Sequence, residues 1–413
     1  MTDLKIAGPT LADFEGARER VSTVAKVTPL ETAQFVSSVL GSPVFLKCEN
    51  LQRTGSYKLR GAYNRLSRLT DEEKSRGVVA ASAGNHAQGV AYAARELGIK
   101  ATIFMPVGVA LPKLQATRGY GAEVVLLGTS VEEGLIGAAT FVEETGAVLI
   151  HPFDHEDVVM GQGTLGLEIL DQVPDVDTII IPIGGGGLIS GVSSAVKQKA
   201  ALEGREIRII GVQSANAAPY PLSLENGYPT AIQTMPTIAD GIFVAKPGEL
   251  NFAIVKDTVD EIITVDDDLI ARAILLLLER GKLVVEPAGA VGVAAILAGK
   301  VKDAGRTVVI LSGGNIDPLM MERVISHGLA ASERYLKLRI PLPDRPGQLA
   351  RTAELVAQAN ANVVEVLHTS HGNGLQINQV ELELHIETRG PKHAEIVLAT
   401  LRDAGYEPRV DFR

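Results

Sequence analysis

The side chain with the clearest potential for catalysis is Lys58, in the stretch Arg-Thr-Gly-Ser-Tyr-Lys-Leu-Arg-Gly at residues 53–61. It follows two small, turn-forming residues, Gly55 and Ser56. A lysine that forms a Schiff base with a carbonyl cofactor must lie in a cleft, partly desolvated, with its amine near neutrality. The stretch therefore predicts a nucleophilic lysine. The alternative is an exposed lysine at the start of a helix.

Four consecutive glycines form a second unusual stretch, Gly184, Gly185, Gly186 and Gly187, followed by Leu188. Without Cβ atoms, backbone N–H groups can approach an anion closely, and the N-terminus of a following helix favours negative charge. A tight turn would need only one or two glycines, so the run favours a phosphate-binding loop. It is not a Walker A loop, because no lysine follows, and it is not a strict dinucleotide fingerprint.

Two further loops carry amide and hydroxyl groups: Ser82-Ala83-Gly84-Asn85-His86 and Ser312-Gly313-Gly314-Asn315. The amide of Asn85 could bond a phenolate oxygen, or Asn85 could simply form a turn. A substrate carboxylate could rest on the N–H groups of the first loop. Ser312 could meet a ring nitrogen or cap the next helix. Glu286 could support a cofactor or be a solvated carboxylate.

Strands must place these loops. Apolar runs alternate with helix-length segments at residues 77–82, 101–105, 123–127, 178–183, 207–212 and 307–311, and a short apolar strand at 44–48 leads into the Lys58 loop. Near-continuous apolar strands separated by helices predict a buried, mostly parallel sheet, and hence an α/β fold. Ligands bind at the carboxyl ends of such strands. If the sheet is parallel, the three loops converge on one edge.

The pattern changes after about residue 332. Leu336, Leu338 and Ile340 alternate with charged residues, which predicts a half-buried strand. The segments that follow predict the order βαββαβ, a small antiparallel sheet backed by two helices. We expect a separate C-terminal domain of about 80 residues.

Composition bounds the function. A chain of 413 residues suggests two or three domains, and the net charge of −10 argues against a nucleic-acid partner. One cysteine, Cys48, excludes an internal disulfide and fits a cytoplasmic protein. We expect neither a signal peptide nor a membrane span. The eight histidines lack metal-ligand spacing, so no metal is predicted. A non-catalytic amino-acid sensor and a nucleotide-binding regulator remain as alternatives to an enzyme.

Together these stretches resemble the threonine dehydratase (threonine ammonia-lyase) family of fold-type II pyridoxal-phosphate enzymes, over about residues 10–325. The motifs are residues 56–62, 82–89, 184–188, 286–289 and 312–315. The resemblance implies a catalytic region like the tryptophan synthase β fold, with twisted, mostly parallel sheets. It would span residues 1–327, with a smaller subdomain at roughly 50–155, then a linker at 328–334 and a regulatory domain at 335–413.

The resemblance implies pyridoxal 5'-phosphate as the cofactor and assigns a role to each motif residue. Lys58 would be the Schiff-base lysine and would remove the α proton. The cofactor phosphate would lie on Gly184, Gly185, Gly186 and Gly187, with Leu188 following. Asn85 would bond the ring hydroxyl and Ser312 would face the ring nitrogen. The substrate carboxylate would lie on Ser82, Ala83, Gly84, Asn85 and His86, with Tyr57 and Glu286 in support.

The implied reaction is β-elimination of water from L-threonine, giving 2-oxobutanoate and ammonia, the first step towards isoleucine. L-serine would be a secondary substrate. The alternative is a serine dehydratase or serine racemase of the same fold. Ala83 argues against the racemase, because it stands where racemases place a serine. Gln213 stands where cation-binding relatives have a glutamate, which argues against a divalent ion there.

The C-terminal segment, with Asp344-Arg345-Pro346-Gly347 and the βαββαβ order, is similar to an ACT domain. ACT domains bind amino acids and regulate the attached enzyme. The resemblance implies an amino-acid effector, isoleucine first, with valine opposing it, and a homotetramer. The alternative is a dimerisation module that binds no ligand.

Overall fold

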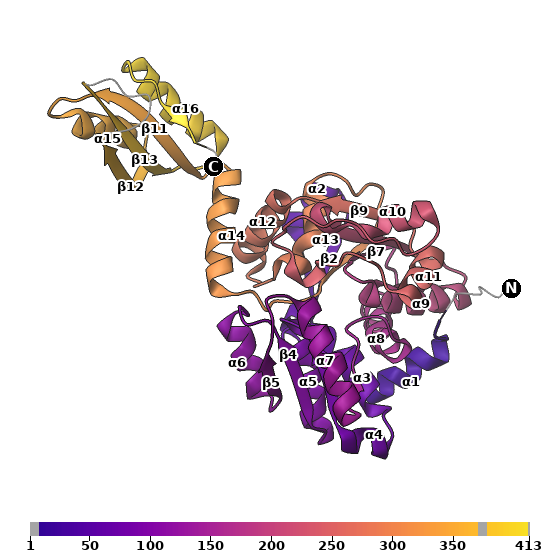
Figure 1. The fold of residues 1–413 in the computed structure, drawn as a ribbon. Coiled ribbons are helices and arrows are strands. Elements are labelled where there is room, and N and C mark those ends of the chain that lie inside the picture. The colour runs from indigo at the N-terminus through magenta and orange to yellow at the C-terminus, as the bar shows by residue number, and fades with distance from the viewer. Residues whose placement is uncertain (1–7, 371–377, 412–413) are drawn as a thin grey trace. The chain divides into compact units, whose positions relative to one another are not determined.

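The structure is a computed structural model that describes residues 8–370 and 378–411 of the 413-residue chain. It divides into two compact units, Met1–Pro318 and Leu319–Arg413 (Figure 1). The second unit begins with helix α14 (Pro318–Ala331), which runs into the segment expected to be the 328–334 linker. Each unit is described by itself.

The larger sheet of the first unit has six strands in the order β1-β2-β10-β7-β8-β9. Only β1 is antiparallel to its neighbour, and the other pairs are parallel. The strands are β1 (Leu30–Thr32), β2 (Val44–Cys48), β7 (Thr178–Pro182), β8 (Arg208–Ser214), β9 (Glu261–Val265) and β10 (Thr307–Leu311). The last strand in sequence, β10, thus lies between β2 and β7.

The smaller sheet is entirely parallel, in the order β5-β4-β3-β6. Its strands are β3 (Val78–Ala81), β4 (Ala101–Met105), β5 (Glu123–Leu126) and β6 (Val148–Leu149). The expectation that three loops converge on one sheet edge is therefore wrong. The loop after β3 leaves the smaller sheet, whereas the loops after β7 and β10 leave the larger one. Apolar runs identify strands but not their partners, so the sequence pattern does not divide them into two sheets.

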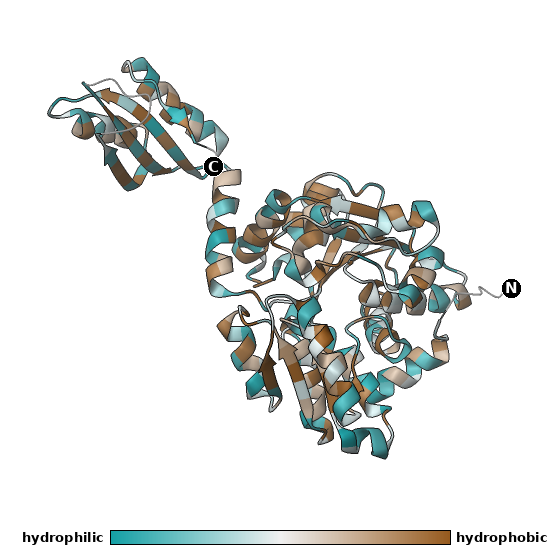
Figure 2. Cartoon of the chain, viewed as in Figure 1, coloured by the Kyte–Doolittle hydropathy of each residue, from teal (hydrophilic) through white to brown (hydrophobic). Residues whose placement is uncertain are grey.

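The α/β fold with mostly parallel sheets is confirmed, and every residue of β3, β4, β7 and β10 is buried. The strands of both sheets are mainly hydrophobic, whereas the short helix α4 (Asp71–Arg76) is hydrophilic and has no buried residue (Figure 2). Three strands were not predicted. β1 and β6 have three and two residues, too few for a periodic pattern, and β9 is only partly buried.

Helices cover the sheets of the first unit. Helix α1 (Leu11–Val21) begins at a capping box made by Thr10 and Asp13. The other helices are α2 (Gln34–Leu40), α3 (Lys58–Ser67), α5 (Asn85–Leu97), α6 (Leu111–Gly119), α7 (Val131–Thr145), α8 (Glu156–Gln172), α9 (Gly187–Leu202), α10 (Pro219–Asn226), α11 (Glu249–Thr258), α12 (Asp267–Leu276) and α13 (Pro287–Leu297). Short helical segments are η1 (Glu49–Leu51), η2 (Ala215–Ala217), η3 (Asp240–Ile242) and η4 (Leu277–Gly281).

The second unit has the predicted βαββαβ order after α14. Its elements are β11 (Tyr335–Pro343), α15 (Gln348–Gln358), β12 (Asn362–Thr369), β13 (Gln379–Glu387), α16 (Pro391–Asp403) and β14 (Arg409–Val410). The four strands form an antiparallel sheet in the order β12-β13-β11-β14. Alternate residues of β11, including Leu338 and Ile340, are buried together with Leu382 and Leu384 of β13. The half-buried alternation expected from the sequence is therefore confirmed.

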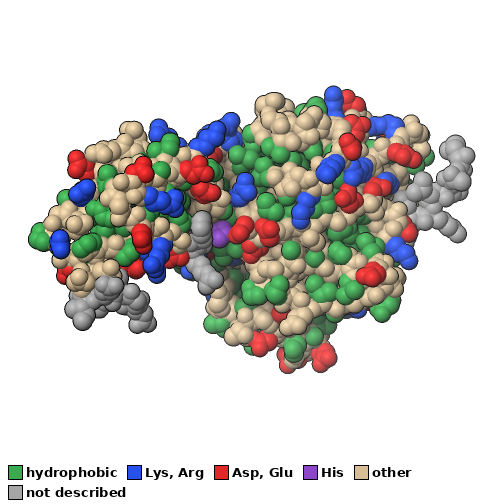
Figure 3. All heavy atoms as spheres, turned by 90° about the horizontal axis from the view of Figure 1, so that it is seen from above, with side chains coloured by type: hydrophobic (Ala, Val, Ile, Leu, Met, Phe, Trp, Pro, Cys, Tyr) green, Lys and Arg blue, Asp and Glu red, His purple; other side chains and the backbone are tan. Residues whose placement is uncertain are grey.

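The surface carries charges of both signs. On the face drawn in Figure 3, acidic and basic side chains are interspersed, and neither sign forms an extended patch. Within residues 8–370 and 378–411, no helix has the length and apolar character needed to cross a membrane.

Candidate active site

Lys58 is the first residue of α3 and is only partly exposed. Its Nζ donates a hydrogen bond to the carbonyl oxygen of Pro152 at 2.8 Å and lies 5.4 Å from the centre of the Tyr57 ring. Burial lowers the pKa of Lys58 to about 8, although the nearby carboxyl of Glu286 opposes this shift. The alternative of an exposed lysine is therefore wrong. The amine is held inward and loses its charge more readily than an ordinary lysine.

The Lys58 loop is tied to the loop that follows β10. Ser56 pairs with Gly313 in an isolated antiparallel bridge, and the N–H of Tyr57 donates to the carbonyl oxygen of Ser312 at 3.1 Å. Ser312 is buried, with 3% of its surface exposed. Backbone bonds of this kind fix Lys58 and Ser312 relative to each other without using their side chains.

Helix α5 lies directly against Lys58. A Cβ atom on Gly89 would come within 3.1 Å of the Lys58 carbonyl carbon, so glycine makes this close approach possible without a shift of the backbone. It brings the N-terminus of α5, which follows the loop at residues 82–84, to the side of α3. The smaller sheet thereby supplies its loop to the same place as the larger sheet.

Side-chain amide groups connect four segments: the loop before Lys58, the start of α5, the loop before α13 and the loop after β10. Asn315 Nδ2 donates to the carbonyl oxygen of Thr54 at 2.7 Å and to Asn85 Oδ1 at 2.8 Å. Asn85 Nδ2 in turn donates to Glu286 Oε1 at 2.6 Å. An amide has two N–H donors, so one donor of Asn85 remains for a ligand. Asn315 belongs to a predicted motif, but sequence analysis gave it no role.

Glu286 is a buried carboxyl group, with 4% of its surface exposed. Burial raises the pKa of Glu286 to about 7, and Asp240 adds to the rise, whereas Lys113, Asn85 and Lys58 oppose it. Near neutral pH this group is therefore a mixture of acid and carboxylate. The reading of Glu286 as a solvated carboxylate is wrong.

His86 is buried and neutral. Burial lowers the pKa of His86 to about 3, and the charge of Lys58 contributes to the same direction. Its Nε2 lies 2.8 Å from the carbonyl oxygen of Ile150, which can only accept, so Nε2 carries the proton. The ring therefore holds the loop against the smaller sheet. Of the remaining groups, Ser82 Oγ accepts from the N–H of Gly84 at 3.2 Å.

The glycine loop excludes side chains at its centre and end because Phe153 lies against it. A Cβ atom on Gly185 would come within 2.5 Å of the Phe153 ring, and one on Gly187 within 2.9 Å of the Phe153 Cβ. Asn251 Nδ2 donates to the carbonyl oxygen of Phe153 at 3.1 Å and fixes this segment. No sequence pattern pointed to Phe153 or Pro152, since they follow a strand of only two residues.

The other two glycines are also closely packed. A Cβ on Gly184 would lie 3.1 Å from the Cα of Ile242, and one on Gly186 would lie 2.0 Å from the hydroxyl of Tyr220. Gly186 also has φ of 107°, which L-residues rarely adopt. A tight turn would account for Gly186 alone. The last three of the four glycines exclude a side chain, the first leaves little room for one, and α9 begins at the fourth, where N–H groups lack helical partners.

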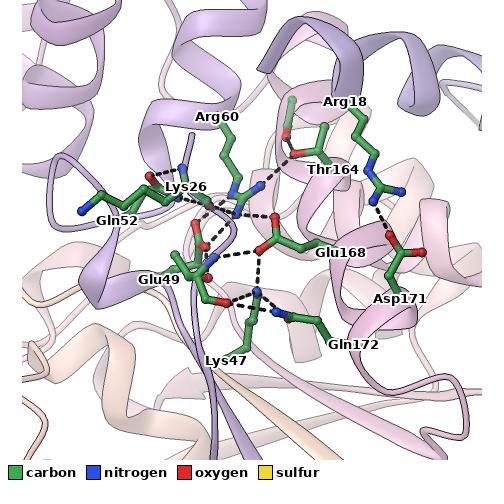
Figure 4. Close-up of polar contacts among 12 residues, drawn as sticks. Arg18, Lys26, Lys47, Glu49, Gln52, Arg60, Thr164, Glu168, Asp171 and Gln172 are labelled. Carbon is green, nitrogen blue, oxygen red and sulfur yellow. Dashed lines mark hydrogen bonds and ion pairs between the residues drawn. The ribbon is translucent and has the colours of Figure 1, made fainter. Parts of the chain in front are cut away.

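A buried ionic network supports α3 below the site (Figure 4). Arg60 donates to both carboxylate oxygens of Glu49 at 2.8 Å and to Glu168 at 2.9 Å. Lys47 pairs with the other Glu168 oxygen at 2.5 Å. Two cations and two carboxylates thus join β2, η1, α3 and α8. Because α3 begins with Lys58, this network fixes the helix that presents the amine.

Neither of two other candidate groups is placed to react. Burial raises the pKa of Cys48 to about 12, so the thiol is not a nucleophile at neutral pH. Gln213 uses its amide on the backbone: Oε1 accepts from the N–H of Tyr220 at 3.1 Å, and Nε2 donates to the carbonyl of Ile183 at 3.5 Å. Within the described part of the chain, no cluster of three His, Cys, Asp or Glu side chains suits a metal ion.

Comparison with known proteins identifies the chemistry of this arrangement. Residues 21–313 match the family model described as pyridoxal-phosphate dependent enzyme. A curated L-threonine ammonia-lyase from Thermotoga maritima is 46% identical over 97% of this chain and 99% of its own length. One from Geobacter sulfurreducens is 46% identical over 95% of this chain and 97% of its own.

A solved structure is similar as well. The processed form of threonine deaminase isoform 2 from Solanum lycopersicum has a TM-score of 0.72 and 38% identity, covering 79% of this chain and 97% of that one. This likeness in fold accompanies the likeness in sequence. The chain therefore belongs to the family of pyridoxal-phosphate dependent enzymes, within the group that contains the threonine ammonia-lyases.

Proposed function

We propose that the chain catalyses the deamination of L-threonine to 2-oxobutanoate and ammonia, with pyridoxal 5'-phosphate as cofactor. The observation that carries the proposal is the amine of Lys58, held inward by Pro152, with its pKa lowered to about 8. The next residue, Phe153, packs against the glycine loop. Two adjacent residues, Pro152 and Phe153, therefore contact the reactive amine and the proposed anion-binding loop. The identity to the L-threonine ammonia-lyases over nearly the whole chain supports the choice of substrate.

The residues present fit the cofactor. A glycine loop in which three of four positions exclude a Cβ atom, at the start of the 16-residue helix α9, suits a phosphate group. In this proposal Gly184 to Gly187, with Leu188, hold the phosphate. Asn85 has a donor left for the ring hydroxyl, and Ser312 provides a hydroxyl for the ring nitrogen. Lys58 would hold the cofactor through its amine until the substrate amine takes its place, which frees Nζ to act as a base.

The bound cofactor supplies a sink for the electron pair left when the substrate loses its α proton. Lys58 Nζ takes that proton, for which a pKa near the working pH is best. The Cβ–O bond then breaks, and the leaving hydroxyl group takes up one proton and departs as water; in the net balance this is the proton that Lys58 took from the α carbon. Hydrolysis of the unsaturated amine that leaves the site gives 2-oxobutanoate and ammonia.

The loop of Ser82, Ala83, Gly84, Asn85 and His86 is proposed to receive the substrate carboxylate at the N-terminus of α5. The neutral ring of His86 contributes by holding the loop to Ile150 rather than by offering charge. Glu286 acts through Asn85, whose amide it orients at 2.6 Å. Tyr57 lies beside the Lys58 amine and limits its positions.

The alternative within the same fold is a serine dehydratase or serine racemase. Ala83 has no hydroxyl that could return a proton to the opposite face of the α carbon, which favours elimination over racemisation. The test is release of 2-oxo acid by the purified chain with pyridoxal phosphate, measured on L-threonine and on L-serine. We expect higher kcat/KM for L-threonine and no formation of D-serine from L-serine.

The same assay with Lys58→Ala should lose at least about a thousandfold in kcat, because general-base catalysis and nucleophilic attachment are removed together. The control is Lys100→Ala, which removes an exposed lysine paired with Glu123. A wild-type chain that binds the cofactor but turns over neither amino acid would refute the proposed reaction.

We further propose that the second unit is an ACT-like regulatory domain that binds isoleucine, with valine opposing its effect. The support is its βαββαβ order and the turn at residues 344–347, where Gly347 has φ of 90° just before α15. Isoleucine, the end product of a route that begins with 2-oxobutanoate, should lower threonine turnover, and valine should restore it. Calorimetry that detects no isoleucine binding would leave a module without ligand.

A homotetramer is proposed from the exposed edge of the antiparallel sheet in the second unit. Strand β12 is one of the two outer strands, and Val364, Val366 and Leu367 on it are exposed. An apolar edge strand is a ready site for pairing with a second copy. Light scattering should give four chains, and Val366→Lys should give a smaller assembly.

We place the enzyme in the cytoplasm, where the single thiol of Cys48 stays reduced.

A further inference from the structure

An ion pair joins the segments of the two sheets beside the site. Lys113 of α6, which follows β4 of the smaller sheet, pairs with Asp240 of η3, which follows β8 of the larger sheet. The Nζ–Oδ2 distance is 2.7 Å. The two partners differ in their surroundings, because 15% of the Lys113 side chain is exposed and 61% of the Asp240 side chain. The ammonium therefore faces the protein, and the carboxylate lies at the rim.

The ammonium lies close to the loop assigned to the substrate carboxylate. A Cβ atom built on Gly84 would be 3.8 Å from Lys113 Nζ and 3.9 Å from its Cδ. Gly84 is the N-cap of α5, so N–H groups of this 13-residue helix point into the same space. Both charges also act on Glu286: Asp240 raises the pKa of that carboxyl, and Lys113 lowers it.

We propose that Lys113 is a substrate-binding residue, which releases Asp240 and pairs with the α-carboxylate of the incoming amino acid. The proposal rests on the proposed function only in taking an α-amino acid as the substrate. Exchange is easy, since an ion pair with an exposed partner changes an equilibrium by less than about fivefold. A charge-assisted hydrogen bond within the cleft changes binding by about tenfold to a hundredfold.

The competing explanation is that Lys113 and Asp240 only tie the two segments together. The explanations differ in the effect of Asp240. If the ion pair is only structural, removal of either partner has the same effect on substrate binding. If Lys113 binds the substrate, Asp240 competes for it, and its removal leaves Lys113 free for the carboxylate.

The experiment measures binding of L-alanine, which has no β-hydroxyl to eliminate, to the protein loaded with pyridoxal phosphate. Ethylamine is the matched ligand, because it is L-alanine without the carboxylate. The change in the visible absorbance of the bound cofactor gives the dissociation constant for each. The variants are Lys113→Gln, Lys113→Arg and Asp240→Asn. Lys197→Gln is the control, because Lys197 pairs with Asp260 at 2.8 Å with similar exposure, 21% and 42%.

We expect Lys113→Gln to weaken L-alanine binding about tenfold or more and to leave ethylamine binding unchanged. Lys113→Arg should recover part of the loss, and Asp240→Asn should leave L-alanine binding equal or tighter. Equal weakening by Lys113→Gln and Asp240→Asn, or no effect of either on L-alanine, would overturn the proposal. Because L-alanine binding needs no turnover, this result is separate from whether L-threonine is the natural substrate.

Discussion

At the scale of the residue, Glu286 makes stability depend on pH. Its pKa is about 7 in the folded protein, above the ordinary value of 4.5, so the folded state holds more protons between these two values. The free energy of unfolding therefore falls as the pH rises from 4.5 through 7. Relative to Glu286→Gln, the cofactor-free wild type should lose up to about 3 kcal/mol across this window.

Urea unfolding of both proteins at pH 5 and pH 8 measures that difference. Glu286→Gln keeps a side-chain oxygen for Asn85, so the hydrogen bond at 2.6 Å has an acceptor in the variant. Glu143→Gln, at an exposed position of α7, is the control and should show the wild-type pH dependence. If the difference in unfolding free energy between wild type and Glu286→Gln does not change with pH, the pKa of the Glu286 carboxyl is not raised in the folded protein.

Gly185 makes the second prediction at this scale. Gly185→Ala places a Cβ 2.5 Å from the Phe153 ring, so either the ring or the loop must move. Cofactor affinity should fall at least about tenfold, because the loop N–H groups must converge on one phosphate. Gly108→Ala, where no atom lies within 4 Å of the new Cβ, is the control. Titration of the cofactor-free proteins with pyridoxal phosphate gives both affinities, and equal values would show that the loop does not bind the phosphate.

At the scale of the element, α8 carries one buried and one exposed ion pair. Glu168 pairs with Lys47 and Arg60 in the interior, whereas Asp171 pairs with Arg18 at the surface (Figure 4). Glu168→Gln leaves two buried cations with one carboxylate and should cost about 3–5 kcal/mol of unfolding free energy. Asp171→Asn should cost less than about 1 kcal/mol.

Denaturant unfolding of the two variants measures this contrast within one helix. A small and equal loss for both would mean that water reaches the Glu168 network. The kcat of Glu168→Gln provides a second measurement, since the network fixes the helix that begins with Lys58. We expect kcat to fall even at temperatures where the variant remains folded.

Local sequence patterns predicted elements well where the whole element follows one rule. The buried strands β4 and β10 have the predicted limits, because each is a continuous apolar run. The glycine run and the residues next to Lys58 predicted the loops of the site. The division into two sheets, Phe153 and the links made by Asn315 depend on contacts between distant segments. Such contacts leave no periodic trace in the chain.

At the scale of the whole molecule, the two units suggest a division of labour. Removal of Leu319–Arg413 should leave threonine turnover within about threefold of the full chain and abolish its response to isoleucine. The compactness of Met1–Pro318 supports this expectation, as does the solved threonine deaminase, which covers 79% of this chain. Initial rates with and without isoleucine measure both effects. A shortened chain that still responds to isoleucine would place the effector site in the first unit.

The position of β10 has a consequence for synthesis on the ribosome. This strand is made last in the first unit, yet it lies between β2 and β7, and Asn315 just beyond it bonds to Thr54, 261 residues earlier. A nascent chain in which β10 has not yet been made leaves one edge each of β2 and β7 unpaired. Open strand edges favour aggregation, so we expect the nascent chain to be most prone to aggregate in this interval. Because Ser312 and Asn315 follow β10, we expect the chain to bind the cofactor only after the first unit has been synthesised.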